Sequence, residues 1–163
     1  TFMSELPTIS EDLPKSSRYK ALAAQAFMLA DGETNFVATA GNIMALLKEN
    51  FHYLWVGLYV VNQDELHLFV FQGPVACTRI GFGKGVCGTS WQNKVTIVVP
   101  NVDEFPGHIA CSSASKSEIV VPIIKNNEVI AILDVDSEHL DYFDEDDVDG
   151  LEEIANILAN EVF

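Results

Sequence analysis

The sequence predicts an α+β fold, in which helices pack on one face of a single antiparallel sheet. Apolar residues follow helical spacing near the start and the end of the chain, whereas between residues 54 and 136 their period is close to two. The period-two segments also come in pairs joined by short polar turns, which is typical of antiparallel hairpins. We therefore expect the second face of the sheet to carry loops and a ligand pocket.

The chain is predicted to begin with an irregular arm at residues 1–15, which contain two prolines and little periodicity. One domain should follow at residues 16–163, without a linker or an internal repeat. Ser16 or Ser17 is suited to cap a first helix. Apolar positions at helical spacing predict a second helix over residues 33–48.

The middle of the chain is expected to form the sheet. The predicted strands are residues 54–61, 65–71, 95–99, 117–125 and 128–136. A loop rich in glycine and a short helix at residues 86–92 separate the two hairpins. Asp144 is expected to cap a closing helix, because an aspartate side chain can accept hydrogen bonds from the first N–H groups of a helix. The acidic residues in the first turn of this helix suit the positive end of the helix dipole.

The overall charge argues against some classes of partner. The formal net charge is −15, from 24 acidic and nine basic residues. Such a surface repels phosphate backbones, so we expect no nucleic-acid partner. The longest apolar runs have the length of strands, so we expect no membrane span.

Three cysteines, Cys77, Cys87 and Cys111, suggest redox or nucleophilic chemistry. An odd number of cysteines after an acidic N-terminus does not resemble a secreted disulfide framework, so the cytoplasm is the expected compartment. Cys111 lies in a polar connection at residues 101–116, and loops of this length are often functional.

The segment Gly83–Gly88 matches the pattern G-x-G-x-x-G of dinucleotide-binding turns. That motif requires a parallel crossover, whereas the neighbouring strands are predicted to be antiparallel, so no nucleotide cofactor is expected. The segment instead predicts a flexible loop that leads into a helix. The positive end of that helix would favour the thiolate form of Cys87.

Two metal-site patterns are incomplete. Asp134-x-Asp136-x-Glu138 resembles the start of a calcium loop, but His139 occupies the position that requires glycine. The pair His108-x-x-Cys111 lacks the second pair of ligands of a zinc site. We therefore expect no metal.

Asp134 and Asp136 are two residues apart on one predicted strand, so their side chains share a face. Neighbouring carboxyls raise each other's pKa, which favours an acid near neutral pH; the alternative is a strand that simply runs into solvent. A regular two-residue turn would pair Glu118 with Val135 and direct Glu118 away from the aspartates. A shared pocket therefore requires a bulge, for which Pro122 is the natural place because it lacks an N–H.

The residues described above resemble those of free methionine-(R)-sulfoxide reductases, which are stand-alone GAF domains. The resemblance spans about residues 18–163 and rests on the segments Trp55–Tyr59, Gly73–Cys77, Gly83–Gly88, Phe105–Cys111, Ser117–Pro122 and Leu133–Ser137. A GAF fold alone says little about function. Three cysteines together with a glutamate and an Asp-x-Asp pair are a more specific signal.

This resemblance implies a thiol mechanism. Cys111 would attack the sulfoxide sulfur of free methionine (R)-sulfoxide and become a sulfenic acid. Cys77 or Cys87 would then form a disulfide with it, which a thioredoxin-like reductant reopens. The family implies that Cys77 is the more direct partner and that Cys87 exchanges onward, but the sequence does not rank them.

The resemblance also implies how the substrate is held. The carboxyls of Glu118, Asp134 and Asp136 would bind the ammonium group and polarise or protonate the sulfoxide oxygen. Trp55 and Tyr59 would form the wall around the methyl group. Two alternatives remain at this stage, a non-catalytic GAF sensor for a small ligand and a thiol redox switch. A homodimer is compatible with the sequence, which leaves the oligomeric state open.

Overall fold

The computed structural model describes residues 5–163 and confirms the α+β fold. Its six strands form one antiparallel sheet in the order β3-β2-β1-β6-β5-β4. The strands are β1 (Trp55–Asn62), β2 (Glu65–Gln72), β3 (Arg79–Gly81), β4 (Ile97–Val99), β5 (Ser117–Lys125) and β6 (Glu128–Ser137). The helices are α1 (Lys15–Ala30), α2 (Phe36–Asn50), α3 (Gly85–Asn93) and α4 (Glu145–Ile157), with a 3-10 turn η1 (Val102–Glu104) and a π turn η2 (Leu158–Val162).

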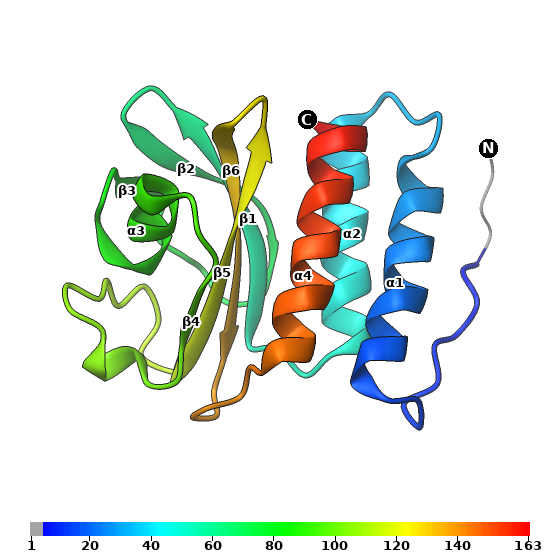
Figure 1. Cartoon of the computed structure of the whole chain (residues 1–163), viewed down its shortest axis with the longest axis horizontal. Coiled ribbons are helices and arrows are strands. Elements are labelled where there is room, and N and C mark those ends of the chain that lie inside the picture. Colours follow the sequence, from blue (N-terminus) through cyan, green and yellow to red (C-terminus); the bar gives the residue numbers. More distant parts are fainter. Residues whose placement is uncertain (1–4) are drawn as a thin grey trace.

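The three long helices lie on one face of the sheet (Figure 1). Helices α2 and α4 contact the strands directly, and α1 packs on the outer side of both. The short helix α3 and the long loops cover the opposite face, so the prediction that helices occupy one face holds only for the long ones. None of the helices in residues 5–163 has both the length and the apolar character needed to cross a membrane.

Each face of the sheet buries its own apolar cluster. Leu22, Ile43, Leu58 and Leu133 belong to the cluster beneath the long helices, and all four are fully buried. The cluster on the loop side is smaller and includes Cys87. Burial on both faces explains why β1, β5 and β6 contain nearly continuous apolar runs, since a strand covered on both sides has no solvent face.

The start of the chain differs from its prediction. Helix α1 begins at Lys15, and its N-cap is Pro14 without a side-chain hydrogen bond, so the predicted serine caps are wrong. Residues 5–14 contain no helix or strand, yet Ile9 is buried in the core. Residues 1–4 of the predicted arm lie outside the described part of the chain.

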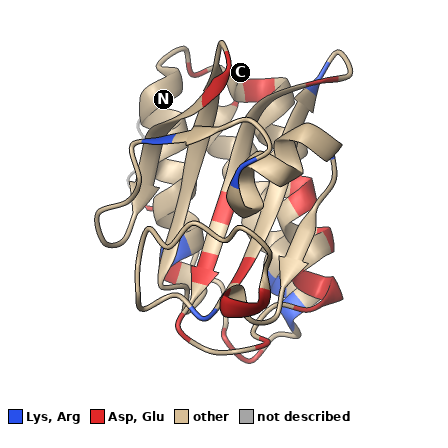
Figure 2. Cartoon of the chain, turned by 90° about the vertical axis from the view of Figure 1, so that its left-hand side faces the viewer, with Lys and Arg blue, Asp and Glu red and all other residues tan. Residues whose placement is uncertain are grey.

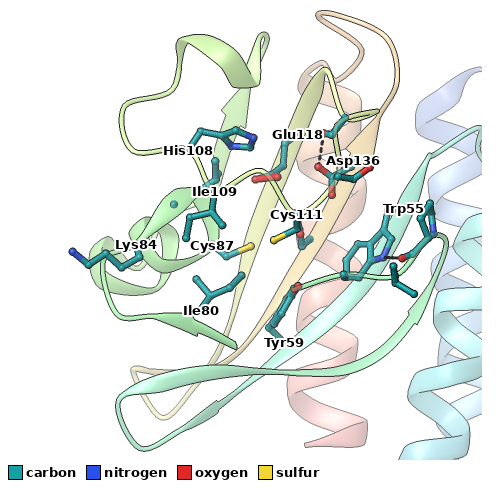
Figure 3. Close-up of a pocket in the computed structure, with 18 residues that line it drawn as sticks. Trp55, Tyr59, Ile80, Lys84, Cys87, His108, Ile109, Cys111, Glu118 and Asp136 are labelled. Atoms are coloured by element: carbon teal, nitrogen blue, oxygen red, sulfur yellow. Dashed lines mark hydrogen bonds between the residues drawn. The ribbon is translucent and has the colours of Figure 1, made fainter. Parts of the chain in front are cut away.

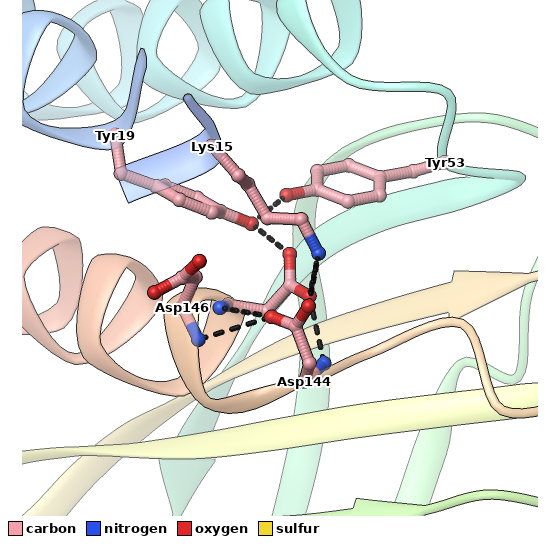
Figure 4. Close-up of polar contacts among 6 residues, drawn as sticks. Lys15, Tyr19, Tyr53, Asp144 and Asp146 are labelled. Carbon is pink, nitrogen blue, oxygen red and sulfur yellow. Dashed lines mark hydrogen bonds and ion pairs between the residues drawn. The ribbon is translucent and has the colours of Figure 1, made fainter. Parts of the chain in front are cut away.

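The predicted cap of the last helix is confirmed. The Asp144 carboxylate accepts hydrogen bonds from the N–H groups of Asp146 and Asp147, and the Asp147 carboxylate accepts one from the Asp144 N–H. Lys15 reaches the same two carboxylates from α1, at 2.9 Å from Asp144 and 2.8 Å from Asp147 (Figure 4). This arrangement joins the start of α1 to the start of α4.

Two buried tyrosines extend this network toward the sheet. The Tyr19 hydroxyl donates to the Asp147 carboxylate at 2.6 Å and is hydrogen-bonded to the Tyr53 hydroxyl, two residues before β1 (Figure 4). Gly150 makes room for Tyr19, because a Cβ at that position would lie 2.1 Å from the tyrosine ring. The network therefore connects both helices to the beginning of β1.

The hairpin of β5 and β6 contains the predicted irregularity. Asn126 and Asn127 both have positive φ, at 53° and 63°, as expected for the tight turn that joins twisted strands. Ile124 pairs with Val129 whereas Ile123 pairs with Ala131, so Ile130 is an extra residue on β6.

The bulge exists, but its predicted location at Pro122 is wrong. Pro122 pairs regularly with Ile132. It lies beyond the three residues of β5 that pair with β4, on a stretch with a free edge, where proline is tolerated.

Candidate active site

A pocket lies on the loop side of the sheet, between the central strands, α3 and the loops before β3 and β5. The volume that the centre of a water molecule can occupy is about 50 Å³. The lining includes every site residue predicted from the sequence, namely Trp55, Tyr59, Cys87, Cys111, Glu118, Asp134 and Asp136, except Cys77. In Figure 3 the side chains of Cys87, Cys111 and Glu118 point into the same space.

The bulge brings the three carboxyl groups together. Because of Ile130, Glu118 pairs with Asp136 across the two strands, and Asp134 lies two residues away on the same face. Trp55 of β1 pairs with Asp136 from the other side. Acidic segments accordingly lie side by side in the middle of the sheet face shown in Figure 2.

Burial controls the protonation of these carboxyls. It raises the pKa of Glu118 and of Asp134 well above the usual range, and the charges of the neighbouring carboxylates raise both further. The pKa of Asp136 is also raised by burial, but hydrogen bonds from Glu118 and Ser115 oppose that shift. The alternative that this strand end runs into solvent is therefore excluded. The cluster can supply a proton and can neutralise a bound cation.

Cys87 behaves differently from its prediction. It is buried at the start of α3, next to Asp134. Burial raises its pKa well above the ordinary value, and the charges of Asp134 and Glu118 raise it further. These effects outweigh the helix dipole, so the expectation that Cys87 is activated as a thiolate is wrong.

Cys77 and Cys111 form a disulfide, with their Cα atoms 5.3 Å apart. Cys87 is the remaining cysteine and carries a free thiol. The arrangement therefore contains one cysteine pair and, beside the carboxyls, one isolated thiol. The disulfide agrees with the pairing that the resemblance had implied.

The two predicted aromatic residues hold the Cys77 loop in addition to lining the pocket. The Trp55 Nε1–H donates to the Pro74 carbonyl at 3.0 Å, and the Tyr59 hydroxyl donates to the Cys77 carbonyl at 2.9 Å. Their ring centroids are 6.0 Å apart. The Trp55 ring also stacks on Phe71.

Three residues near the site were not assigned to it from the sequence. Ser115 donates to Asp136 at 2.7 Å. His108 lines the pocket and was considered only as a zinc ligand. Gly57 permits the position of Trp55, because a Cβ there would lie 2.4 Å from the indole ring. Gly57 left a sequence signal of this role, because a glycine inside a strand often marks a close approach.

A GAF domain family model matches residues 33–161, more than half of the chain. The chain belongs to the GAF domain family. It is 52% identical over 147 residues to GAF domain-containing protein A of Dictyostelium discoideum, covering 90% of this chain and 93% of that protein. It is 41% identical over 142 residues to the free methionine-R-sulfoxide reductase of Escherichia coli, covering 86% of each.

Solved structures agree with this membership. The crystal structure of free methionine-R-sulfoxide reductase from Neisseria meningitidis, in complex with its substrate, superimposes on this GAF domain with a TM-score of 0.93. The two sequences are 48% identical, and the match covers 98% of this chain and 96% of the other. The likeness of the fold therefore extends over nearly the whole chain.

Proposed function

We propose that this GAF domain reduces free methionine (R)-sulfoxide to methionine by thiol chemistry. The observation that carries the proposal is a cysteine pair at a pocket lined by the buried carboxyls of Glu118 and Asp134 and the half-buried carboxyl of Asp136. A redox-active thiol and a proton source are the two components that sulfoxide reduction requires. The relatives from Escherichia coli and Neisseria meningitidis that bear the name of this activity support it.

In the first step, the Cys111 thiolate attacks the sulfoxide sulfur while the oxygen takes up a proton. The attack forms a transient sulfur–sulfur bond. That bond and the sulfur–oxygen bond of the substrate then break as the oxygen bonds to Cys111 Sγ and methionine leaves. Methionine sulfoxide and a thiol thereby become methionine and a Cys111 sulfenic acid. The Glu118 carboxyl, whose pKa is raised by burial, is suited to donate the proton.

In the second step, the Cys77 thiol attacks the sulfenic sulfur of Cys111 and water leaves. The product is the Cys77–Cys111 disulfide. A dithiol reductant of the thioredoxin type then reopens the bond and is itself oxidised to a disulfide. This requirement places the proposed reaction in a reducing compartment, for which we propose the cytoplasm.

The carboxyls also account for a preference for the free amino acid. A free substrate carries an ammonium group, which would compensate the carboxylates of the buried Asp134 and the half-buried Asp136. Methionine sulfoxide within a peptide lacks that group and could not compensate them. Trp55 and Tyr59 supply apolar surface for the methyl group.

Consumption of free methionine (R)-sulfoxide in the presence of dithiothreitol tests the proposal. We expect turnover by the wild type and none by Cys111→Ser, whereas the S epimer and a peptide-bound sulfoxide should react slowly or not at all. A sensor would bind the compound without turnover, and a redox switch would cycle its disulfide without a preference among these compounds. Either result would contradict the proposal.

A further inference from the structure

Three side chains of types that can ligate a metal form a cluster on the pocket wall. Cys87 Sγ and one carboxylate oxygen each from Glu118 and Asp134 all lie within 4.8 Å of one another. They come from α3, β5 and β6, so the cluster depends on the tertiary fold. All three residues are buried. The reaction proposed above assigns no step to the Cys87 thiol.

Asp134 gives an independent sign that this cluster lacks a ligand. Its side chain is only 7% exposed, and its Oδ1 atom has no hydrogen-bond partner in the described part of the chain. A buried carboxylate oxygen without a partner is costly, so native structures usually satisfy such atoms with water or an ion. The adjoining cavity of about 50 Å³ offers room for either.

The donor set selects among ions. Mg²⁺ and Ca²⁺ prefer oxygen donors alone, whereas Zn²⁺ binds cysteine sulfur together with carboxylate oxygen. Ligand atoms around Zn²⁺ lie roughly 3.5 Å apart, so the present separations require only small side-chain adjustments. We propose that Cys87, Glu118 and Asp134 bind a thiophilic divalent cation of the Zn²⁺ type. Binding of the cation displaces the Cys87 thiol proton, and any proton on the two carboxyls, into solvent. Three protein ligands leave the fourth tetrahedral position to water.

Such an ion would act as an inhibitor. It would occupy the place where the ammonium group of the substrate is proposed to bind, and Glu118 could not both ligate the ion and donate a proton. This consequence rests on the proposed function, whereas binding of the ion does not. Binding of the ion and its inhibition of the reaction are therefore measured separately.

Binding is measured on the oxidised protein. Two of the three cysteines are then in the disulfide, so Cys87 is the one free thiol. Titration against a chromophoric chelator should give Zn²⁺ binding about 100-fold or more tighter than Mg²⁺ binding. Cd²⁺ should produce the ultraviolet charge-transfer band of a metal–thiolate bond. Equal affinity for Zn²⁺ and Mg²⁺, or no band with Cd²⁺, would overturn the proposal without any variant.

Isosteric variants then identify the ligands. Cys87→Ser should abolish the Cd²⁺ band, and Cys87→Ser, Glu118→Gln and Asp134→Asn should each weaken Zn²⁺ binding by about tenfold or more. The double variant Cys77→Ser/Cys111→Ser is the matched control, because it keeps Cys87 as the only cysteine and should retain both the affinity and the band. Unchanged Zn²⁺ affinity in folded Cys87→Ser would contradict the assignment.

Competition tests the consequence for the site. Free methionine (R)-sulfoxide should weaken Zn²⁺ binding beyond the effect of an equal concentration of glycine, which chelates Zn²⁺ in solution through the same amino and carboxylate groups. Equal effects would show that the ion and the substrate do not share a site. If Zn²⁺ binds but no reductase activity is found, the proposed function fails alone; if the protein turns over without binding Zn²⁺, the metal site fails alone.

Discussion

Glu118 and Asp136 face each other across β5 and β6, and a hydrogen bond from Glu118 opposes the rise in the pKa of Asp136. In this chain the pairing exists because Ile130 is left unpaired, so that Ile123 pairs with Ala131 and not with Ile130. Side chains alternate between the faces of a strand, so this one-residue shift of the pairing determines which face Glu118 shares with the aspartates.

Deleting Ile130 should leave the site intact, because the residue that it removes is the unpaired one. Ile123 would still pair with Ala131 and Glu118 with Asp136, now in a regular hairpin, so we expect kcat/KM for free methionine (R)-sulfoxide to stay within about threefold of the wild-type value. Circular dichroism reports whether the sheet persists.

An insertion between the bulge and the site is the contrasting variant. One glycine added after Ile132 moves Asp134 and Asp136 by one position along β6, so Glu118 would pair with Val135 and point away from both aspartates. We expect kcat/KM to fall at least about 100-fold, the loss of roughly 3 kcal/mol of transition-state stabilisation. Full activity in this insertion variant would show that the pairing is not required.

Glu118→Gln should stabilise the free protein and inactivate it. The wild-type carboxyl is buried beside Asp134 and Asp136, and burial first, then the charges of the neighbouring carboxylates, raises its pKa and that of Asp134. Removing one ionisable group should add about 0.5–2 kcal/mol to the free energy of unfolding, which raises Tm by roughly 1–8 °C for a chain of this size. Scanning calorimetry measures the gain. Glu153→Gln, on the exposed side of α4, should change Tm little, and a lower Tm for Glu118→Gln would contradict the argument.

Gly57→Ala and Gly41→Ala should change stability in opposite directions. A Cβ at Gly57 would lie 2.4 Å from the Trp55 ring, so we expect a loss of about 1–3 kcal/mol in the free energy of unfolding and a higher KM. Nothing lies within 4 Å of a Cβ at Gly41 in α2, where alanine should stabilise by about 0.5–1 kcal/mol. Urea unfolding of both variants measures the contrast. Equal effects would show that the strand glycine does not hold the indole in place.

The bulge shows how much of the site the sequence could predict. Turn length and side-chain alternation were enough to show that Glu118 needs an extra residue to join the aspartates. They could not place that residue, because a bulge anywhere between the turn and the site restores the same parity. We predicted the bulge at Pro122 because proline lacks an N–H, yet the unpaired residue is Ile130 on the opposite strand.

Cys87 shows what the sequence could not predict. Its position near a helix start was correct, but its pKa depends on burial and on carboxylates that lie 31 or more residues away in the chain. The short strand β3 was missed for a similar reason, since its three residues acquire a strand conformation only by pairing with β2. Local patterns therefore predicted the elements better than the chemical state of the side chains.

Alkaline pH should destabilise the protein through Tyr19 and Tyr53. Burial raises the pKa of both hydroxyls well above 10.0, with a further contribution from the charge of Asp147. Below about pH 10 the tyrosines are protonated in both states and their contribution is complete. As the pH rises further, the unfolded chain releases these protons and the folded chain does not, so stability falls. Tm measured from about pH 8 to 11 should drop more steeply for the wild type than for Tyr19→Phe, and parallel curves would contradict this.

Tyr59→Phe should slow disulfide formation more than the attack on the substrate. The phenylalanine ring keeps the apolar wall, but it removes the hydrogen bond to the Cys77 carbonyl that holds this loop toward Cys111. One such bond contributes about 0.5–1.5 kcal/mol, so the second step should slow by roughly 2- to 10-fold. In a single turnover of the reduced protein, methionine should appear at the wild-type rate while a sulfenic-acid trap labels more Cys111. If methionine release slows and labelling does not rise, the hydroxyl serves substrate binding instead of the loop.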